Sequence, residues 1–152
     1  MGKRKRYSAE LRKEIKKNLV FAKLKYFPGS PRKMRLLADK IRGKRIEDAL
    51  LFLKYAKKAY ATPLRKLLLS AINNWEQKYE DIRVEDAQLY ISEIYVDGAG
   101  MLKRIRPAPM GRAHLIRKRR CHVTIFLDAL NKEKLISSTK EVAETEENKN
   151  NA

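Results

Sequence analysis

The sequence predicts an α+β fold, in which a small domain of three helices and a three-stranded antiparallel sheet carries a long protruding β-hairpin. Three segments place apolar residues at helical spacing, and three others alternate in the manner of strands. A third observation concerns charge. Residues 98–127, which we call the basic arm, contain eight Lys and Arg residues and no Asp or Glu. The basic arm joins the last two predicted strands, which indicates a projecting ribbon.

The first predicted strand covers residues 19–27. Alternation divides its side chains between two faces, one with Phe21, Lys23 and Lys25 and the other with Ala22, Leu24 and Tyr26. A Pro-Gly-Ser-Pro sequence at residues 28–31 ends the strand. Residues 1–18 precede it as a basic extension, whose few apolar positions predict at most a short helix formed against a partner.

The first predicted helix follows this turn, with Ser30 as N-cap, Pro31 at the first helical position and Gly43 just past the end. Its apolar stripe consists of Met34, Leu37, Ala38 and Ile41. The other side is cationic, with Arg32, Lys33, Arg35, Lys40 and Arg42. One side of this helix therefore packs, and the other is available to a polyanion.

Two further helices are predicted to complete the core. The second begins near Ile46 and fades at Lys57 and Lys58. The third uses Thr62 as its cap and Pro63 in its first turn, and it ends near Glu80. Its apolar stripe consists of Leu64, Leu67, Leu68, Ala71, Ile72 and Trp75. The acidic pairs at residues 80–81 and 85–86 are interpreted as solvated turns.

The last two predicted strands cover residues 87–96 and 122–127. In the former, alternation separates Leu89 and Ile91 from the face with Tyr90, Ser92, Ile94 and Val96. If the two strands pair, the chain between them runs out and back over about 12 residues each way, or about 40 Å at roughly 3.3 Å per residue. A core of about 110 residues has a radius of gyration near 13 Å, so the ribbon must project.

Composition narrows the class of protein. The net charge of +18 exceeds what solubility requires and points to an acidic partner. A single cysteine, Cys121, argues against a disulfide framework and fits a cytoplasmic protein. No apolar stretch is long enough for a secretory signal or a membrane span. Residues 131–152 are rich in Lys, Glu, Asn, Ser and Thr, and we expect them to be disordered.

The candidates for catalysis are few. A metal site would need His114, Cys121 and His122, whose spacing matches no paired zinc pattern. Arg119 and Arg120 are expected to lower the pKa of Cys121, but the basic arm has no acid to orient His122 as a base. The sequence therefore predicts no enzyme activity, no metal and no cofactor.

From the residues alone, three classes of polyanion-binding protein stay open. The first is an RNA-binding scaffold, because the basic arm mixes cations with apolar residues that can contact bases. The second is an architectural DNA-binding protein of the histone-like type, which also uses basic β-arms but requires a dimer. The third is a peripheral membrane protein, which the lack of a strongly amphipathic helix with aromatic residues opposite its cations disfavours.

Several sequence motifs together resemble the bacterial ribosomal large-subunit protein L22 (uL22) family over about residues 20–128. They are Ser30-Pro-Arg-Lys-Met-Arg-Leu-Leu-Ala-Asp-Lys-Ile-Arg-Gly-Lys44, Leu69-Ser-Ala-Ile-Asn-Asn74, Val96-Asp-Gly98, Lys103-Arg-Ile-Arg-Pro107, Gly111-Arg-Ala113 and His122-Val-Thr-Ile125. The sequence departs from the family where relatives often have Arg-Pro-Arg-Ala-Met-Gly-Arg, because it has Pro109 and lacks one cation there. It also has Arg120 and Cys121 where Thr-Ser is common.

The resemblance implies a cytoplasmic ribosomal protein that is monomeric within the large subunit and has no membrane partner. It implies partners in large-subunit rRNA, neighbouring ribosomal proteins and the nascent polypeptide, and a role in assembly. Residues and resemblance together predict a basic extension (1–18), a globular domain (19–130) with the extended hairpin (97–122), and a disordered tail (131–152). The residues expected to contact rRNA are Lys23, Lys25, Arg32, Lys33, Arg35, Lys40, Arg42, Lys44, Lys103, Arg104, Arg106, Arg112, Arg117, Lys118, Arg119 and Arg120. The hairpin tip expected to line the nascent-peptide tunnel is Arg106, Pro107, Ala108, Pro109, Met110, Gly111 and Arg112.

Overall fold

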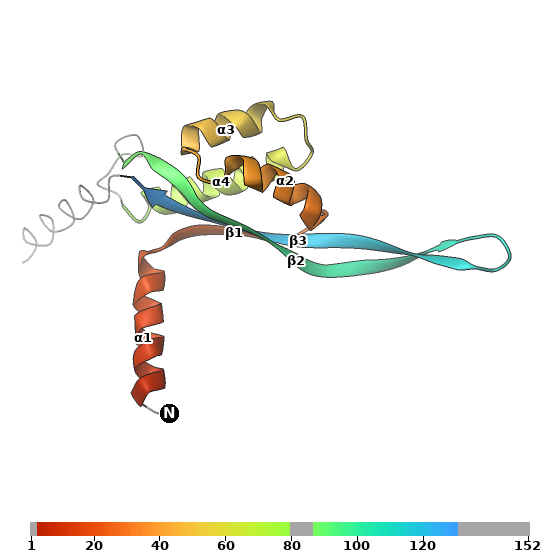
Figure 1. The fold of residues 1–152 in the computed structure, drawn as a ribbon, viewed down its shortest axis with the longest axis horizontal. Coiled ribbons are helices and arrows are strands. Elements are labelled where there is room, and N and C mark those ends of the chain that lie inside the picture. The colour runs from red at the N-terminus through yellow and green to blue at the C-terminus, as the bar shows by residue number, and fades with distance from the viewer. Residues whose placement is uncertain (1–2, 80–86, 131–152) are drawn as a thin grey trace, which may run out of the picture.

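The computed structural model describes residues 3–79 and 87–130. In this part of the chain, four helices accompany one antiparallel sheet of strand order β1-β3-β2 (Figure 1). The elements are α1 (Lys3–Asn18), β1 (Val20–Phe27), α2 (Pro31–Ile41), α3 (Ile46–Tyr55), α4 (Ala61–Glu76), β2 (Leu89–Pro107) and β3 (Ala113–Ala129). The predicted α+β fold with a protruding hairpin is confirmed.

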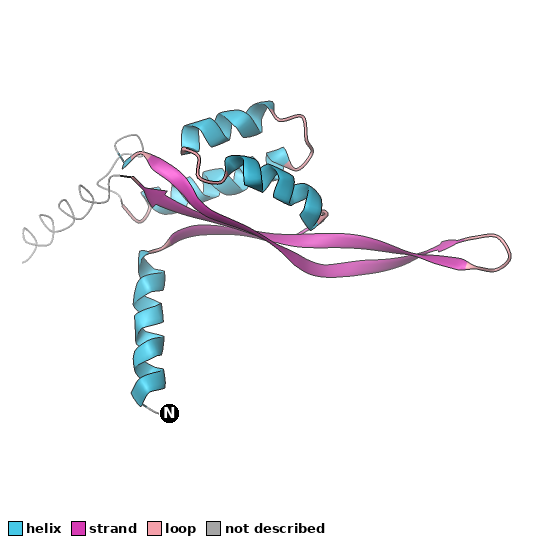
Figure 2. Ribbon diagram, in the orientation of Figure 1, coloured by secondary structure: helices cyan, strands magenta, loops and turns pink. Residues whose placement is uncertain are grey.

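The core lies between one face of the sheet and the helices. Helices α2 and α4 cover this face, and α3 packs against α4 as the outermost layer (Figure 2). The stripes predicted for α2 and α4 are buried, with Met34 and Leu68 fully inaccessible and Trp75 only 1% exposed. From the sheet, Ile91 and Ile125 complete the same core. Helices α2 and α4 therefore use their apolar stripes within their own chain.

The predicted faces of β2 are wrong beyond Ile91. Leu89, Ile91, Ile94 and Val96 are all buried, although strict alternation would place the first two opposite the last two. The pairing of β2 with β3 shifts between Ile91 and Glu93, where β2 contains one extra residue. A bulge of this kind reverses the faces of every later side chain, so all four apolar residues reach the core.

The helix boundaries differ from the predicted ones in detail. The first turn of α4 begins at Ala61, with Tyr60 rather than Thr62 at the N-cap position, and the helix ends at Glu76 rather than near Glu80. Ser30 does occupy the N-cap of α2, but its side chain makes no capping hydrogen bond. Gly43 adopts φ +72° just past α2, as expected for a residue that ends a helix.

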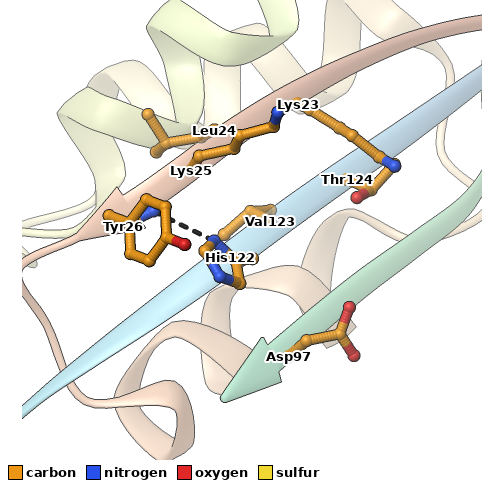
Figure 3. Close-up of a pocket in the computed structure, with 8 residues that line it drawn as sticks. All are labelled: Lys23, Leu24, Lys25, Tyr26, Asp97, His122, Val123 and Thr124. Atoms are coloured by element: carbon orange, nitrogen blue, oxygen red, sulfur yellow. Dashed lines mark hydrogen bonds between the residues drawn. The ribbon is translucent and has the colours of Figure 1, made fainter. Parts of the chain in front are cut away.

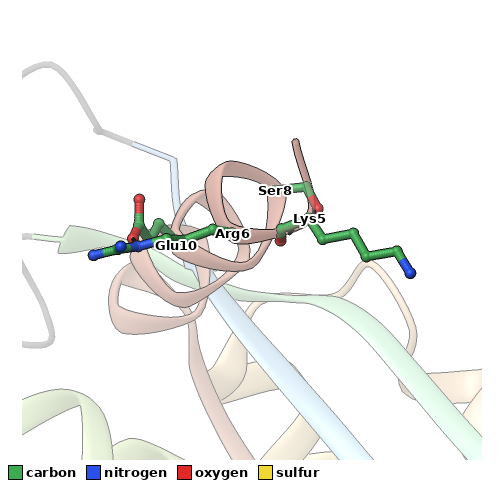
Figure 4. A network of polar contacts seen from close by, with 4 residues as sticks. All are labelled: Lys5, Arg6, Ser8 and Glu10. Atoms are coloured by element: carbon green, nitrogen blue, oxygen red, sulfur yellow. Dashed lines mark hydrogen bonds and ion pairs between the residues drawn. The ribbon is translucent and has the colours of Figure 1, made fainter. Parts of the chain in front are cut away.

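Helix α1 is longer than the short helix predicted for the basic extension. It has 16 residues and stands away from the sheet (Figure 1). An ion pair one turn apart joins Arg6 Nε to Glu10 Oε1 at 3.0 Å, and Ser8 Oγ donates to the carbonyl of Lys5 at 3.3 Å (Figure 4). An exposed ion pair at this spacing contributes only about 0.3–0.5 kcal/mol. The expected disordered tail and the acidic pairs at 80–81 and 85–86 lie outside the described residues.

Candidate nucleic-acid interface

Residues 98–120 of the basic arm lie in a two-stranded ribbon, whereas residues 121–127 belong to the three-stranded sheet. The strands predicted at 87–96 and 122–127 do not stop at the domain, because the pairing of β2 with β3 runs from Leu89 with Ala129 to Pro107 with Ala113. A five-residue turn closes the ribbon, and in it the amide of Ala108 donates to the carbonyl of Arg112 at 2.8 Å. The ribbon extends well beyond the helices (Figure 1).

The turn depends on two residues in the left-handed region. Met110 has φ +61° and Gly111 has φ +70°. Glycine adopts this conformation without strain, whereas methionine does so at a cost. The side chain of Met110 is 93% exposed, so nothing in the described chain holds it. The tip therefore presents an apolar side chain to whatever surrounds it.

Cations lie on both faces of the ribbon. Lys103 pairs with Arg117 across the strands, and Arg104 pairs with Ile116 on the opposite face. The first pair places two like charges directly opposite each other, which destabilises an isolated ribbon. Among the described residues, no carboxylate forms an ion pair with any cation of the basic arm. The ribbon is therefore suited to a polyanion that neutralises both faces.

The cations predicted on α2 fall into two groups. Arg35 donates from Nε and Nη2 to the carbonyl of Val96, and Arg42 donates from Nη2 to the carbonyl of Ile94 at 3.2 Å while pairing with Asp39 at 2.9 Å. The remaining three are exposed, with no hydrogen bond or ion pair to the described chain: Arg32, Lys33 and Lys40. Only the second group is fully available to a partner.

The end of β1 differs from the predicted alternation. Tyr26 has φ +53°, at a point where the pairing with β3 is irregular, and its side chain is 60% exposed instead of packing with Ala22. Its amide donates to Nδ1 of His122 at 3.0 Å (Figure 3). The sequence carried no signal for this pair, because the two residues are 96 positions apart. Lys23 and Lys25 lie beside it, both exposed.

The prediction for the Cys121 thiol is wrong in sign. The side chain is fully buried in the core, and burial raises the pKa of this thiol above its ordinary value of 9.0. The neighbouring arginines do not reverse this effect, because Cys121 points into the core from β3 while Arg119 is exposed on the ribbon. In the described residues, no group of three or more His, Cys, Asp or Glu side chains is placed to hold a metal ion.

Fold and interface together define a class: a small α+β domain with basic helices and a projecting basic β-ribbon. The family model of ribosomal protein L22p/L17e matches residues 22–128. The chain therefore belongs to the L22p/L17e family of ribosomal proteins. It is a component of the large ribosomal subunit and not an enzyme.

Individual relatives agree with the family. The large ribosomal subunit protein uL22 of Flavobacterium johnsoniae is 58% identical over 131 residues, which cover 86% of this chain and 96% of the relative. The protein of the same name from Porphyromonas gingivalis is 54% identical over 131 residues, covering 86% and 97%. That from Bacteroides thetaiotaomicron is 54% identical over 129 residues, covering 85% and 94%. No helix in the described residues is long and apolar enough to cross a membrane.

Proposed function

We propose that this chain binds large-subunit rRNA, supports assembly of the subunit, and lines the nascent-peptide tunnel with its hairpin tip. The observation that carries the proposal is the basic arm, which has eight cations and no acid and whose ribbon projects away from the helices. Two paired strands are marginally stable alone in water, and like charges weaken them further. A polyanion that surrounds the ribbon removes both problems.

The cations form two contact regions for rRNA. The first is the ribbon itself, where Lys and Arg alternate with exposed apolar residues such as Ile105, 72% exposed, that can pack against bases or sugars. The second is the outer side of α2 with Arg32, Lys33 and Lys40. Because arginine binds phosphate through two parallel hydrogen bonds, the arginine-rich shaft at residues 117–120 suits the RNA backbone.

The tip is assigned to the tunnel on different grounds. The residues from Arg106 to Arg112 include two prolines, a glycine and the exposed Met110, and they contain fewer cations than the shaft. A surface of mixed character suits a passage through which many different peptides move. Pro109 stiffens the turn, and its carbonyl accepts from the amide of Arg112 at 3.5 Å. Neighbouring ribosomal proteins and the nascent chain are the partners that this arrangement implies.

A histone-like DNA-binding protein is the competing class, and it requires a dimer built on the helices. Here α2 and α4 bury these apolar stripes against their own sheet, so the stripes themselves are not available to form a dimer core. This arrangement favours a monomer. Light scattering on the isolated protein separates the classes, since a stable dimer would contradict our proposal.

Fractionation of a cell lysate tests the proposed rRNA-bound role. We expect the protein to sediment with large subunits at low salt and to remain with them after a high-salt wash, because an integral component is held by many contacts. Release at moderate salt would contradict this. For the tip, a photo-crosslinker at Met110 should react with a stalled nascent chain, while one at Tyr55 on α3 should not. Equal reaction at both positions would contradict the tunnel assignment.

A further inference from the structure

The face of the sheet opposite the helices carries a row of aromatic rings. Phe21 and Phe126 are paired across β1 and β3, with ring centroids 5.7 Å apart. Tyr95 on β2 continues the row, with its ring centroid 6.1 Å from that of Phe126. On the other face, Ile94 and Ile125 are buried in the core. The row therefore crosses all three strands on the face that α2 and α4 leave uncovered.

A second aromatic group lies further along the same face. The rings of Tyr26 and His122 meet edge to face, with centroids 4.6 Å apart. Because Nδ1 of His122 accepts the amide proton of Tyr26, the neutral ring carries its own proton on Nε2. His122 and Phe126 are four positions apart on β3, or about 13 Å at roughly 3.3 Å per residue. The uncovered face of the sheet thus holds two separate aromatic groups.

A pocket of about 310 Å³ lies beside the second aromatic group, that of Tyr26 and His122. It is lined by residues of all three strands, and Lys23 reaches from β1 towards Thr124 on β3 (Figure 3). Asp97 on β2 contributes a carboxylate at the opposite side. The volume falls within the range of small-ligand sites, and the pocket offers an ammonium, a hydroxyl, a carboxylate and aromatic rings.

The charges on this face are ordered from one strand to the next. Lys23 and Lys25 lie on β1, whereas Glu93 and Asp97 lie on β2. Glu93 also accepts a hydrogen bond from the Tyr95 hydroxyl at 2.8 Å, which holds that ring in place. A nucleic acid on this face would place its phosphates over β1. Its base edges would face β2, where carboxylates accept hydrogen bonds from amino groups.

The position of the face within the chain points to the same ligand. Helix α1, with eight Lys and Arg residues, precedes the end of β1 that pairs with Leu127. The basic arm leaves the sheet at the other end, beyond Cys121. A polyanion that contacts both segments can run along the sheet on the face that α2 and α4 leave uncovered in the described residues (Figure 1).

We propose that this face binds unstacked bases of the large-subunit rRNA. We call Phe21, Lys23, Tyr26, Tyr95, His122 and Phe126 the sheet-face platform. Its rings stack on bases, and Lys23 binds a phosphate. Exposed aromatic residues on a sheet, interspersed with cations, are how sheet-based modules hold single-stranded RNA, since every base has a face that can stack. This second proposal rests on the proposed rRNA binding, and it adds that the uncovered face of the sheet binds single-stranded RNA.

Binding of short RNA to the full-length protein tests the platform. The variant is Tyr95→Leu, and the matched control is Tyr55→Leu, which removes another exposed tyrosine from α3. The probes are a fluorescent 12-nucleotide single strand of mixed sequence, a duplex of the same sequence, and a large-subunit rRNA transcript. Tyr95→Leu should weaken single-strand binding about tenfold and leave duplex binding nearly unchanged. Tyr95→Phe keeps the ring and should restore the affinity.

Ultraviolet crosslinking of the wild-type complex is the second measurement, because it needs no variant to fold. Crosslinked nucleotides should map to the peptides that contain Phe21, Tyr26 or Tyr95. Absence of crosslinks there, or equal single-strand affinity for wild type and Tyr95→Leu, would overturn the platform. So would a Tyr95→Leu variant that weakens contact with another ribosomal protein but not with RNA.

Failure of the platform can be told apart from failure of the proposed function. If the platform alone is wrong, the wild type still binds the rRNA transcript, and Lys103→Gln combined with Arg117→Gln weakens that binding. If the proposed function is wrong, neither the wild type nor any variant binds the transcript with measurable salt dependence. The first pattern, together with equal single-strand affinity for wild type and Tyr95→Leu, overturns the platform alone, and the second overturns both proposals.

Discussion

Arg35 holds the carbonyl of Val96, donating from Nε at 3.2 Å and from Nη2 at 3.0 Å. Arg42 does the same for the carbonyl of Ile94. Nearer the start of β2, the amide of Gly43 donates to the carbonyl of Ile91 at 2.9 Å. The amide of Ile91 in turn donates to the carbonyl of Lys44 at 3.0 Å. Strand β2 is an edge strand, so α2 and its following loop cover the open edge up to the point where the basic arm begins.

Removing the Arg35 side chain should destabilise the domain. Arg35→Ala leaves the Val96 carbonyl without this donor, and hydrogen bonds to charged groups contribute about 1.5–3 kcal/mol. We expect the free energy of unfolding to fall by about 1–2 kcal/mol, because the site is only partly buried. Urea denaturation followed by Trp75 fluorescence measures this change.

The control for Arg35 is Arg32→Ala on the same helix. Arg32 is exposed and makes no hydrogen bond within the described residues. Its removal should change the free energy of unfolding by less than about 0.5 kcal/mol. Equal losses for the two variants would show that Arg35 acts through charge or helix propensity and not through β2.

The sequence predicts the helices of the core better than the strands that carry the site. The stripes of α2 and α4 follow a 3.6-residue period, and the structure buries them as expected. Strand faces depend on a strict period of two, so one extra residue near Ser92 was enough to invalidate the faces expected for Ile94 and Val96. Local spacing cannot reveal a bulge whose cause is the pairing with a distant strand.

The hairpin beyond the domain should be removable. Replacing residues 103–117 with an Asn-Gly turn joins Leu102 to Lys118, which are already paired. Every side chain removed is exposed except that of Ala108, and none belongs to the core. We expect the free energy of unfolding to stay within about 1 kcal/mol of the wild-type value.

A core substitution on the same strand shows how far the free energy of unfolding falls when buried contacts are lost, and the truncation is compared with it. Ile94→Ala on the same strand should cost about 2–5 kcal/mol, because its side chain is 2% exposed. Unfolding of the truncated chain would contradict the division between the domain and its arm.

Cys121 should be unreactive in the folded protein. Because its thiol is buried, reaction with a thiol reagent requires opening of the core, and we expect a rate at least about 100-fold below that of the unfolded chain. Arg119→Cys places a second thiol on the exposed ribbon as a control, and it should react rapidly. Comparable rates for the two thiols would contradict the burial of Cys121.

The same burial predicts a pH dependence. The pKa of the Cys121 thiol is raised above 9.0 in the folded chain, so the folded state holds this proton more tightly than the unfolded state does. Its contribution to stability is complete below the unfolded value and is lost as pH rises through the folded value. Urea denaturation at several pH values between about 8 and 10 measures this loss in the wild type. The free energy of unfolding of Cys121→Ala should lack this pH dependence.

The candidate interface was only partly predictable. A gap in the acidic residues was sufficient to find the basic arm, because composition does not depend on folding. The hydrogen bonds from Arg35 and Arg42 to carbonyls of β2 could not be predicted in this way. A helical sequence pattern does not show whether a cation faces solvent or the edge of a strand. The Tyr26–His122 pair also required the structure, because a bulge in β1 brings the two residues together.

The salt dependence of rRNA binding tests most directly whether the basic arm is the contact. The variant replaces Lys103, Arg104, Arg106 and Arg117 with Gln, and the control makes the same four-charge change at Lys54, Lys57, Lys58 and Lys66. Each phosphate contact contributes about 0.7–0.9 to the slope of log affinity against log salt. The hairpin variant should therefore lose up to about three to four units of slope, with weaker binding at low salt, while the control keeps the wild-type slope. Equal slopes for variant and control would contradict the account.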